Sequence, residues 1–308
     1  MFVKKIFIFF VLFLILNNFA KSQDIFIVAK VDKEIITNID IELEKNYLLL
    51  LNDKLNKISK NEFFKLAKNS LIREIIKKKE IKKSFKKPNK EFKDKITKSF
   101  YNKFGFENKN DFINFLKTKN INFENLKEKL IIEAFWNQLI FIKYNNKIRI
   151  DESSIKNDVI KYFNSRDKKY EFNLSEIIID IDNDIALKKN EILKYVKEFG
   201  FKVAANKYSK SDTSKYGGEI GWIKSSRLTK SIQDHISNIK IGETTEPIQT
   251  SNGYLFLKLN DKREIKEEID LENELKQQVE FEKNRQLNQF SLIYYKKLKK
   301  NTIVYENK

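Results

Sequence analysis

The sequence predicts an α+β protein of two or three domains, and three observations support this. The chain is 308 residues long, which is enough to bury a sizeable core. Amphipathic helical patterns dominate residues 38–144 and 264–300. Between them, residues 170–262 alternate strand-like and helical segments, and three of the seven glycines of the chain lie within positions 217–221. A helical part and a mixed part therefore share the chain.

The composition excludes several classes of site. Cysteine is absent and there is one histidine, so disulfides, thiolate metal centres and imidazole-rich metal centres are excluded. The formal net charge of +18 would suit nucleic acid, anionic lipid or an acidic client protein. We interpret it as lysines spread along solvated helix faces, because no aromatic and basic pattern of the known nucleic-acid modules accompanies it. No nucleic-acid partner is expected.

The amino end predicts a secretory signal peptide at residues 1–22. Lys4 and Lys5 form a basic start, residues 6–16 are apolar, and Ala20 and Ser22 give the small-residue pattern of a cleavage site. The apolar core is too short for a comfortable membrane span. We expect a mature protein outside the cytoplasm, which meets the membrane only during export. An uncleaved membrane anchor is the alternative.

The segment that follows, up to residue 163, predicts two short strands and a series of helices. The strands lie in residues 25–37 around a turn at Asp32, and Thr37 or Asn38 caps a helix that ends at residue 51. Ser59 and Glu62 have the spacing of a capping box at the start of the next helix. Further helices are predicted between Pro88 and Gly105, at residues 111–117 and at residues 123–144.

The middle of the chain alternates strands and helices. A strand is predicted at residues 171–179, then a helix from Asp184 to residue 199 that Gly200 ends, then a short helix that ends near Tyr208. The glycine run at 217–221 indicates positive φ angles or a close backbone approach. A strand at 219–223 and a final strand at 254–259 are predicted. Between these strands, apolar residues recur at helical spacing: Leu228, Ile232, Ile236 and Ile239.

Short blocks in this region resemble, in the same order, those of the parvulin-type peptidyl-prolyl isomerase (PpiC or rotamase) family. The blocks are Leu174-Ser175-Glu176-Ile177-Ile178, Tyr208-Ser209, Gly217-Gly218-Glu219-Ile220-Gly221-Trp222, Ile241-Gly242-Glu243, Glu246-Pro247-Ile248 and Asn252-Gly253-Tyr254. The resemblance implies a parvulin-type domain at residues 168–263, built from a four-stranded antiparallel sheet with surrounding helices.

A second resemblance concerns the two ends of the chain. Residues 27–40 resemble the opening of the SurA family of periplasmic chaperones, and the helices after them follow the same order. This implies a helical chaperone module at residues 23–165, completed by residues 264–308 as a helix and a closing strand at 302–305. A generic dimerisation or spacer module is the alternative for the amino-terminal helices. A dangling coiled coil is the alternative for the carboxyl end, although its heptads are not sustained.

The sequence departs from the parvulin family at its polar positions. The family has a histidine in the first strand, another in the last strand, and a cysteine or aspartate before the glycine doublet. These positions are held here by Glu176, Leu255 and Ser211, with Asp212 one residue beyond Ser211. Leu255 offers no side-chain hydrogen bond, so the paired imidazoles are missing. The apolar positions of the family's proline pocket are held by Ile220, Leu228 and Ile232. We therefore expect a peptide-binding domain with weak or absent catalysis.

Other candidate sites carry little chemistry. His235 follows Asp234 and Ser231, but their successive spacings of three and one on a helix do not align the three groups as a triad. The glycine run is not followed by a phosphate-binding helix signature, so nucleotide binding is not expected. We expect no cofactor and no ATP, and no metal, since cysteine is absent and there is one histidine. The resemblances imply a periplasmic chaperone whose partners are unfolded exported proteins, including outer-membrane protein precursors. An active envelope prolyl isomerase and a membrane-anchored quality-control factor are the rival hypotheses.

Overall fold

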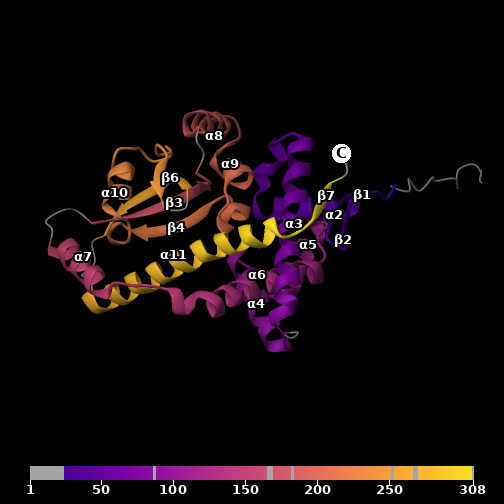
Figure 1. Cartoon of the computed structure of the whole chain (residues 1–308), viewed down its shortest axis with the longest axis horizontal. Coiled ribbons are helices and arrows are strands. Elements are labelled where there is room, and N and C mark those ends of the chain that lie inside the picture. Colours follow the sequence, from indigo (N-terminus) through magenta and orange to yellow (C-terminus); the bar gives the residue numbers. More distant parts are fainter. Residues whose placement is uncertain are drawn as a thin grey trace, which may run out of the picture.

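The computed structural model describes residues 24–85, 88–164, 169–181, 184–250, 253–265 and 270–306. The predicted signal peptide lies outside these residues. We call residues 24–164 together with 270–306 the helical module, and residues 169–265 the middle domain. Figure 1 shows the middle domain beside the amino-terminal helices, with the carboxyl-terminal helix running beneath its sheet. The fold class predicted from the sequence is confirmed.

The helical module begins with two strands and six helices. In order, these are β1 (Ile27–Val31), β2 (Glu34–Thr37), α2 (Asn38–Leu51), α3 (Lys60–Ser84), α4 (Lys90–Lys103), α5 (Lys109–Thr118), α6 (Phe123–Tyr144) and α7 (Glu152–Asn164). Short 3₁₀ turns lie at Asp53–Lys57 and Asn145–Lys147. Helix α7 was not predicted as a separate element.

The middle domain and the carboxyl end supply the remaining elements. In order, these are β3 (Tyr170–Ile179), α8 (Ile185–Phe199), α9 (Phe201–Tyr208), the 3₁₀ turn η3 (Asp212–Tyr216), β4 (Glu219–Lys224), the 3₁₀ turn η4 (Ser225–Arg227), α10 (Lys230–Ser237), β5 (Ile248–Thr250), β6 (Gly253–Glu264), α11 (Leu271–Lys300) and β7 (Val304–Glu306). The short edge strand β5 was not predicted.

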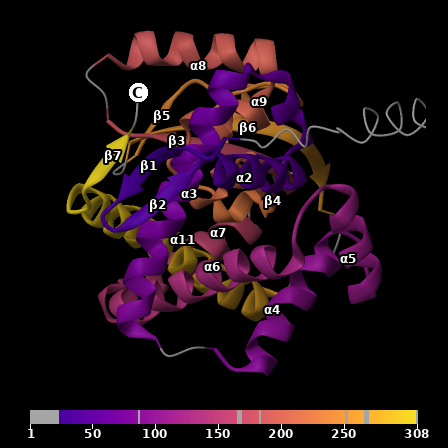
Figure 2. The same ribbon diagram turned by 90° about the vertical axis from the view of Figure 1, so that its right-hand side faces the viewer.

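Both ends of the helical module meet in one small sheet. Its strand order is β2-β1-β7, and β1 pairs antiparallel with β7, with Lys30 opposite Tyr305. Figure 2 shows the three strands side by side. The predicted closing strand at residues 302–305 therefore exists, shifted to Val304–Glu306. This pairing covers an edge of β1 that would otherwise expose unpaired backbone groups.

Two helix starts in the helical module test the predicted caps. Thr37 and Asp40 form a complete reciprocal capping box at the start of α2. At the start of α3, the Ser59 hydroxyl accepts from the Glu62 amide at 3.2 Å, as predicted. The Glu62 carboxylate, however, accepts from Lys207 of the middle domain at 2.6 Å. The predicted box at Ser59 is thus only half formed, because its glutamate is used in a contact between domains.

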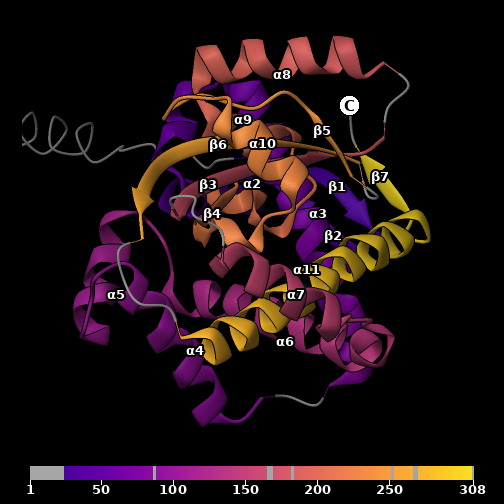
Figure 3. The same cartoon turned by 90° about the vertical axis from the view of Figure 1, so that its left-hand side faces the viewer.

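The four-stranded sheet of the middle domain has the order β4-β3-β6-β5, and all its pairings are antiparallel. On one face, Ile177 and Phe256 belong to the same buried cluster as residues of α8 and α9. On the other face, Leu257 packs in a cluster with Ile236 of α10. Figure 3 shows α8 above this sheet and the helices of the module below it. The sheet is therefore covered on both faces.

Helix α11 packs along the helical module. It lies against α6 and α7, where Phe290 stacks on Tyr144 with ring centroids 4.8 Å apart. The buried Trp136 of α6 donates from Nε1 to the Ser291 hydroxyl at 2.9 Å. Because α11 buries these side chains against its own chain, its apolar residues do not form the seam of a dangling coiled coil. Within the described part of the chain, no helix combines the length and apolar character that a membrane crossing requires.

Candidate peptide-binding site of the middle domain

The glycine doublet holds the loop before β4 against strand β3. Gly217 and Gly218 have φ angles of 72° and 76°, a region that residues with a Cβ rarely adopt. A Cβ at Gly218 would lie 2.2 Å from the backbone oxygen of Glu176. The Glu176 amide donates to the Gly218 carbonyl at 2.8 Å. The glycines therefore allow the backbone contact that brings the loop with Ser211 beside Glu176.

Two of the three predicted polar positions touch. Glu176 Oε1 accepts hydrogen bonds from Ser211 Oγ at 2.7 Å and from Thr213 Oγ1 at 2.9 Å. Burial raises the pKa of the Glu176 carboxyl, and the two hydroxyl donors partly oppose this. Thr213 was not identified from the sequence as a residue of this site. Its position two residues after Ser211, in the turn that Ser211 caps, is the signal that could have indicated it.

The third position, Leu255, belongs to the apolar part of the site. It pairs with Ile178 across β3 and β6, while Glu176 pairs with Leu257. Side chains of paired residues, and of residues two apart along a strand, share one face of a sheet. Leu255 therefore lies on the same face as Glu176. It cannot donate a hydrogen bond there, so the site holds a carboxylate and two hydroxyls in place of paired imidazoles.

The structure brings two of the three predicted pocket residues together. Leu228 and Ile232 are partly buried and pack with Leu255 on one apolar cluster. Ile220 lies apart from this cluster. It is the extra residue at a bulge between β3 and β4 and remains 36% exposed. The apolar wall is thus formed by α10, the turn before it and β6, and Ile220 lies on the adjacent edge strand.

Asp212 points away from this site. Its Oδ1 contacts Lys77 Nζ of α3 at 3.1 Å, and its Oδ2 accepts from the Ser291 hydroxyl of α11 at 2.9 Å. Asp212 therefore does not replace the family's cysteine or aspartate. It fixes the loop to the helical module instead.

We call the charged group around Lys77 the interdomain clamp. It consists of Lys77, Glu133, Asp212 and Lys215. Lys77 is 1% exposed and contacts Glu133 at 3.0 Å, and Lys215 of turn η3 contacts the same carboxylate at 3.0 Å. Our interpretation of the lysines as lying on solvated helix faces is wrong for Lys77. Burial of an ammonium is possible here because two carboxylates surround it.

The clamp keeps its acids ionised. Burial disfavours the charged form of Glu133, but Lys77 and Lys215 outweigh it and hold the pKa of Glu133 far below its usual range. Burial and Glu133 raise the pKa of Asp212, whereas Lys77, Arg73 and Lys215 lower it more, so the net shift is downward. Opposite charges at short distance favour the ionised acid in this way. The middle domain is therefore held on the helical module by charge as well as by apolar packing.

His235 makes a local contact. Its Nδ1 lies 2.7 Å from the carbonyl oxygen of Ser231, one turn earlier in α10, and Asp234 pairs with Lys230 at 2.9 Å. Asp234 and Lys230 are exposed, and His235 is partly exposed. Among the described residues, no group of three or more histidines, aspartates or glutamates is placed to hold a metal ion.

Comparison with known proteins identifies the middle domain. Residues 180–261 match the family model described as rotamase, the PPIC-type PPIase domain. Glu176 lies just before this match, and the other five predicted site residues lie inside it. The chain therefore contains a PpiC-type domain, and the parvulin resemblance inferred from the sequence is confirmed.

Proteins similar to this chain include chaperones and foldases. The chain is 27% identical over 154 residues to the chaperone SurA of Pseudomonas putida, covering 46% of this chain and 36% of that protein. It is 34% identical over 83 residues to the foldase PrsA of a Geobacillus species, and this match covers 27% of this chain and 29% of that protein. The chain thus spans about a third of the length of these curated relatives. The resemblance to SurA is confirmed as a similarity.

Several solved structures align along most of the chain. Among them is one of two SurA-like chaperones of Campylobacter jejuni, with 17% identity and a TM-score of 0.38, and the alignment covers 92% of this chain and 99% of that one.

Proposed function

We propose that this chain is an envelope folding chaperone similar to SurA, which binds unfolded exported proteins in the periplasm, outer-membrane protein precursors among them. One observation carries the proposal. The middle domain keeps an apolar wall of Leu228, Ile232 and Leu255, while its polar positions hold a carboxylate and hydroxyls. An apolar cleft beside a sheet edge can hold an extended peptide without catalysing a reaction.

We further propose that prolyl isomerisation is weak or absent. Rotation about a peptide bond has a barrier of about 18–20 kcal/mol, and a site lowers it by presenting preorganised polar groups to the twisted amide. In this domain the Glu176 carboxylate already accepts from both neighbouring hydroxyls. Leu255 adds only apolar surface. In other enzymes, losing one well-placed donor removes about 2.7–4 kcal/mol of transition-state stabilisation. We therefore expect this domain to lack most of the acceleration of prolyl isomerisation.

The domain division belongs to this proposal. Residues 23–165 and 264–308 would act as one chaperone module, and residues 168–263 as the inserted peptide-binding domain. The β1–β7 pairing and the packing of α11 on α6 support the first unit. Contacts from Asn52 to Asn206 and from Glu62 to Lys207, both at 2.6 Å, support a fixed arrangement of the two units.

Periplasmic residence rests on the predicted signal peptide and on the similarity to SurA. Mass spectrometry of the protein isolated from its native envelope should find Gln23 as the first residue. Recovery of the intact chain in the membrane fraction would favour the membrane-anchored alternative instead.

Two assays test the chaperone proposal against the isomerase alternative. The first measures cis/trans exchange of a proline tetrapeptide, and the second measures suppression of aggregation of an unfolded outer-membrane barrel protein. We expect exchange near the uncatalysed rate together with clear suppression of aggregation. The variant Leu255→Gln, which keeps the size of the side chain but makes the apolar wall polar, should weaken suppression. Rapid turnover by the wild type, with suppression unchanged in this variant, would support the isomerase instead.

A further inference from the structure

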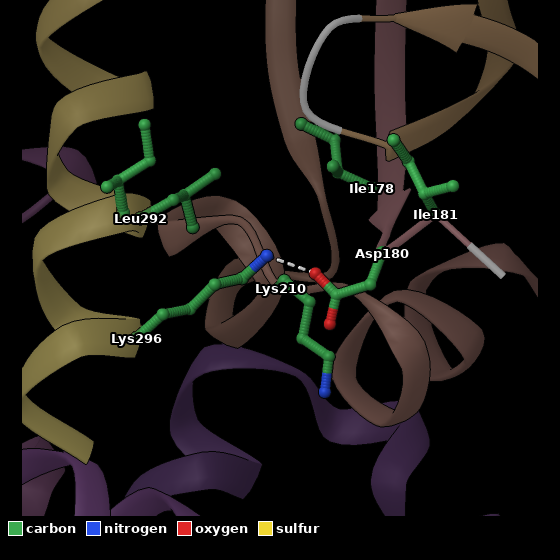
Figure 4. Close-up of a pocket in the computed structure, with 7 residues that line it drawn as sticks. Ile178, Asp180, Ile181, Lys210, Leu292 and Lys296 are labelled. Carbon is green, nitrogen blue, oxygen red and sulfur yellow. Dashed lines mark hydrogen bonds and ion pairs between the residues drawn. The ribbon is translucent and has the colours of Figure 1, made fainter. Parts of the chain in front are cut away.

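A second pocket lies between the end of strand β3 and helix α11. It has a volume of about 340 Å³ and is lined by four aliphatic and three charged residues: Ile178, Asp180, Ile181, Lys210, Leu292, Ile293 and Lys296. Figure 4 shows Ile178 and Ile181 facing Leu292 and Lys296 across it. Ile181 and Ile293 are 62% and 54% exposed. The volume lies at the lower end of the range for ligand pockets and suits one or two side chains of a peptide.

This pocket adjoins the candidate peptide site. Ile178 is the strand partner of Leu255, and the amide of Lys210 donates to the carbonyl of Ile178 at 2.8 Å. Lys210 also directly precedes Ser211 in the chain. Two residues of an extended peptide span about 7 Å, so a peptide lying along the site can place a neighbouring side chain in this pocket.

The charge of the pocket favours an anionic ligand. Lys296 pairs with Asp180, as Figure 4 shows, and the two side chains are about half exposed. Among the described residues, no carboxylate forms an ion pair with Lys210, and the nearby Asp180 is paired with Lys296. Burial and the nearby Lys299, Arg73 and Lys296 lower the pKa of the Lys210 ammonium, although Asp180 opposes this. An added carboxylate would relieve the repulsion between these cations.

We propose that this pocket binds a peptide segment in which an aliphatic residue is followed by an acidic one. The aliphatic side chain packs between Ile178 and Leu292. The carboxylate lies between Lys210 and Lys296 and competes with Asp180 for the latter. This inference rests on the proposed peptide-binding function and adds a preference for acidic residues to it. Since Lys296 belongs to the helical module, such a peptide contacts both parts of the chain.

Fluorescence anisotropy with two labelled peptides tests the inference. The peptides share one sequence, Gly-Ala-Leu-Asp-Ala-Pro-Phe-Gly, except that the second has Asn in place of Asp. The wild type should bind the Asp peptide about fivefold more tightly, equivalent to about 1 kcal/mol, and salt should reduce this preference. The double variant Lys210→Gln/Lys296→Gln should bind both peptides equally. Asp180→Asn should increase the preference, because it removes the competing carboxylate.

Lys297→Gln is the matched control. It removes the same charge from the neighbouring position of α11, outside the pocket lining, and should keep the preference. Equal binding of the two peptides by the wild type, or a preference that survives in the double variant, would overturn the inference. Aggregation suppression is measured in parallel. If the wild type suppresses aggregation without any preference for the Asp peptide, the inference fails while the proposed function stands. If it neither binds peptide nor suppresses aggregation, the proposed function itself fails.

Binding to vesicles of phosphatidylcholine, with and without phosphatidylglycerol, tests an anionic lipid headgroup as the other ligand for these cations. We expect the double variant to bind each kind of vesicle as well as the wild type does. Loss of binding to the anionic vesicles in the double variant, with no preference between the peptides, would assign the cations to a lipid headgroup and reject the peptide site.

Discussion

Replacing Lys77 by methionine should destabilise the contact between the middle domain and the helical module. Lys77 Nζ lies 3.0 Å from Glu133 and 3.1 Å from Asp212, and its side chain is 1% exposed. At an effective dielectric constant of about 20, each contact contributes roughly 5 kcal/mol of attraction before the cost of desolvation. Lys77→Met removes this attraction and leaves two carboxylates with Lys215 as their remaining close ammonium partner. Breaking a buried ion pair in this way costs about 3–5 kcal/mol.

Lys78→Met is the matched control. Lys78 is the next residue of α3 and pairs with Glu128, but the two side chains are 38% and 56% exposed. Pairs of this kind contribute about 0–1 kcal/mol. The two substitutions make the same chemical change on one helix, so they differ chiefly in burial.

Urea unfolding gives the readout. The chain has two tryptophans, so a Trp222→Phe background leaves Trp136, whose ring centroid lies 5.2 Å from Lys77 Nζ. Linear extrapolation then gives the free energy of unfolding around the clamp. A loss below about 1 kcal/mol for Lys77→Met, equal to that of Lys78→Met, would refute the reasoning that the clamp stabilises the domain contact.

Three further predictions concern the acids of the interdomain clamp, the glycines before and within β4, and strand β7. Acid should weaken the domain contact, because the pKa values of Glu133 and Asp212 are lowered in the folded state. The stabilisation from these two carboxylates is fully present above their unfolded-state pKa values, near 4. It is lost progressively as the pH falls below those values. Melting curves between pH 7 and pH 3 should show a smaller loss for Glu133→Gln/Asp212→Asn than for the wild type, and equal losses would count against the clamp. Gly218→Ala should destabilise the middle domain by several kcal/mol, because its Cβ would clash with the Glu176 carbonyl. Gly221→Ala, also at positive φ but with open space around it, should cost only about 1–2 kcal/mol in the same thermal melt. Removing strand β7 should expose the edge of β1, which amide hydrogen exchange would detect as faster exchange in β1, whereas unchanged exchange would show that the pairing contributes little.

The sequence by itself determined the order of elements and the domain type. Helix starts and strand ends depend on residues close in sequence, such as the capping pair Thr37 and Asp40, and Gly200 at positive φ after α8. The glycine doublet likewise indicated a close backbone approach. These features are local, so a pattern of a few residues is enough to predict them.

Only the tertiary structure decided which charged residues are functional partners. Lys77 and Asp212 are 135 positions apart, and nothing near Lys77 distinguishes it from the exposed Lys78 beside it. The same holds for Glu62, which binds Lys207 across the domain contact, and for the pocket that Lys210 and Lys296 line together. Ionic contacts form between whichever groups the packing of distant segments brings within a few ångströms. Their partners therefore depend on the fold of the whole chain, which local sequence patterns do not contain.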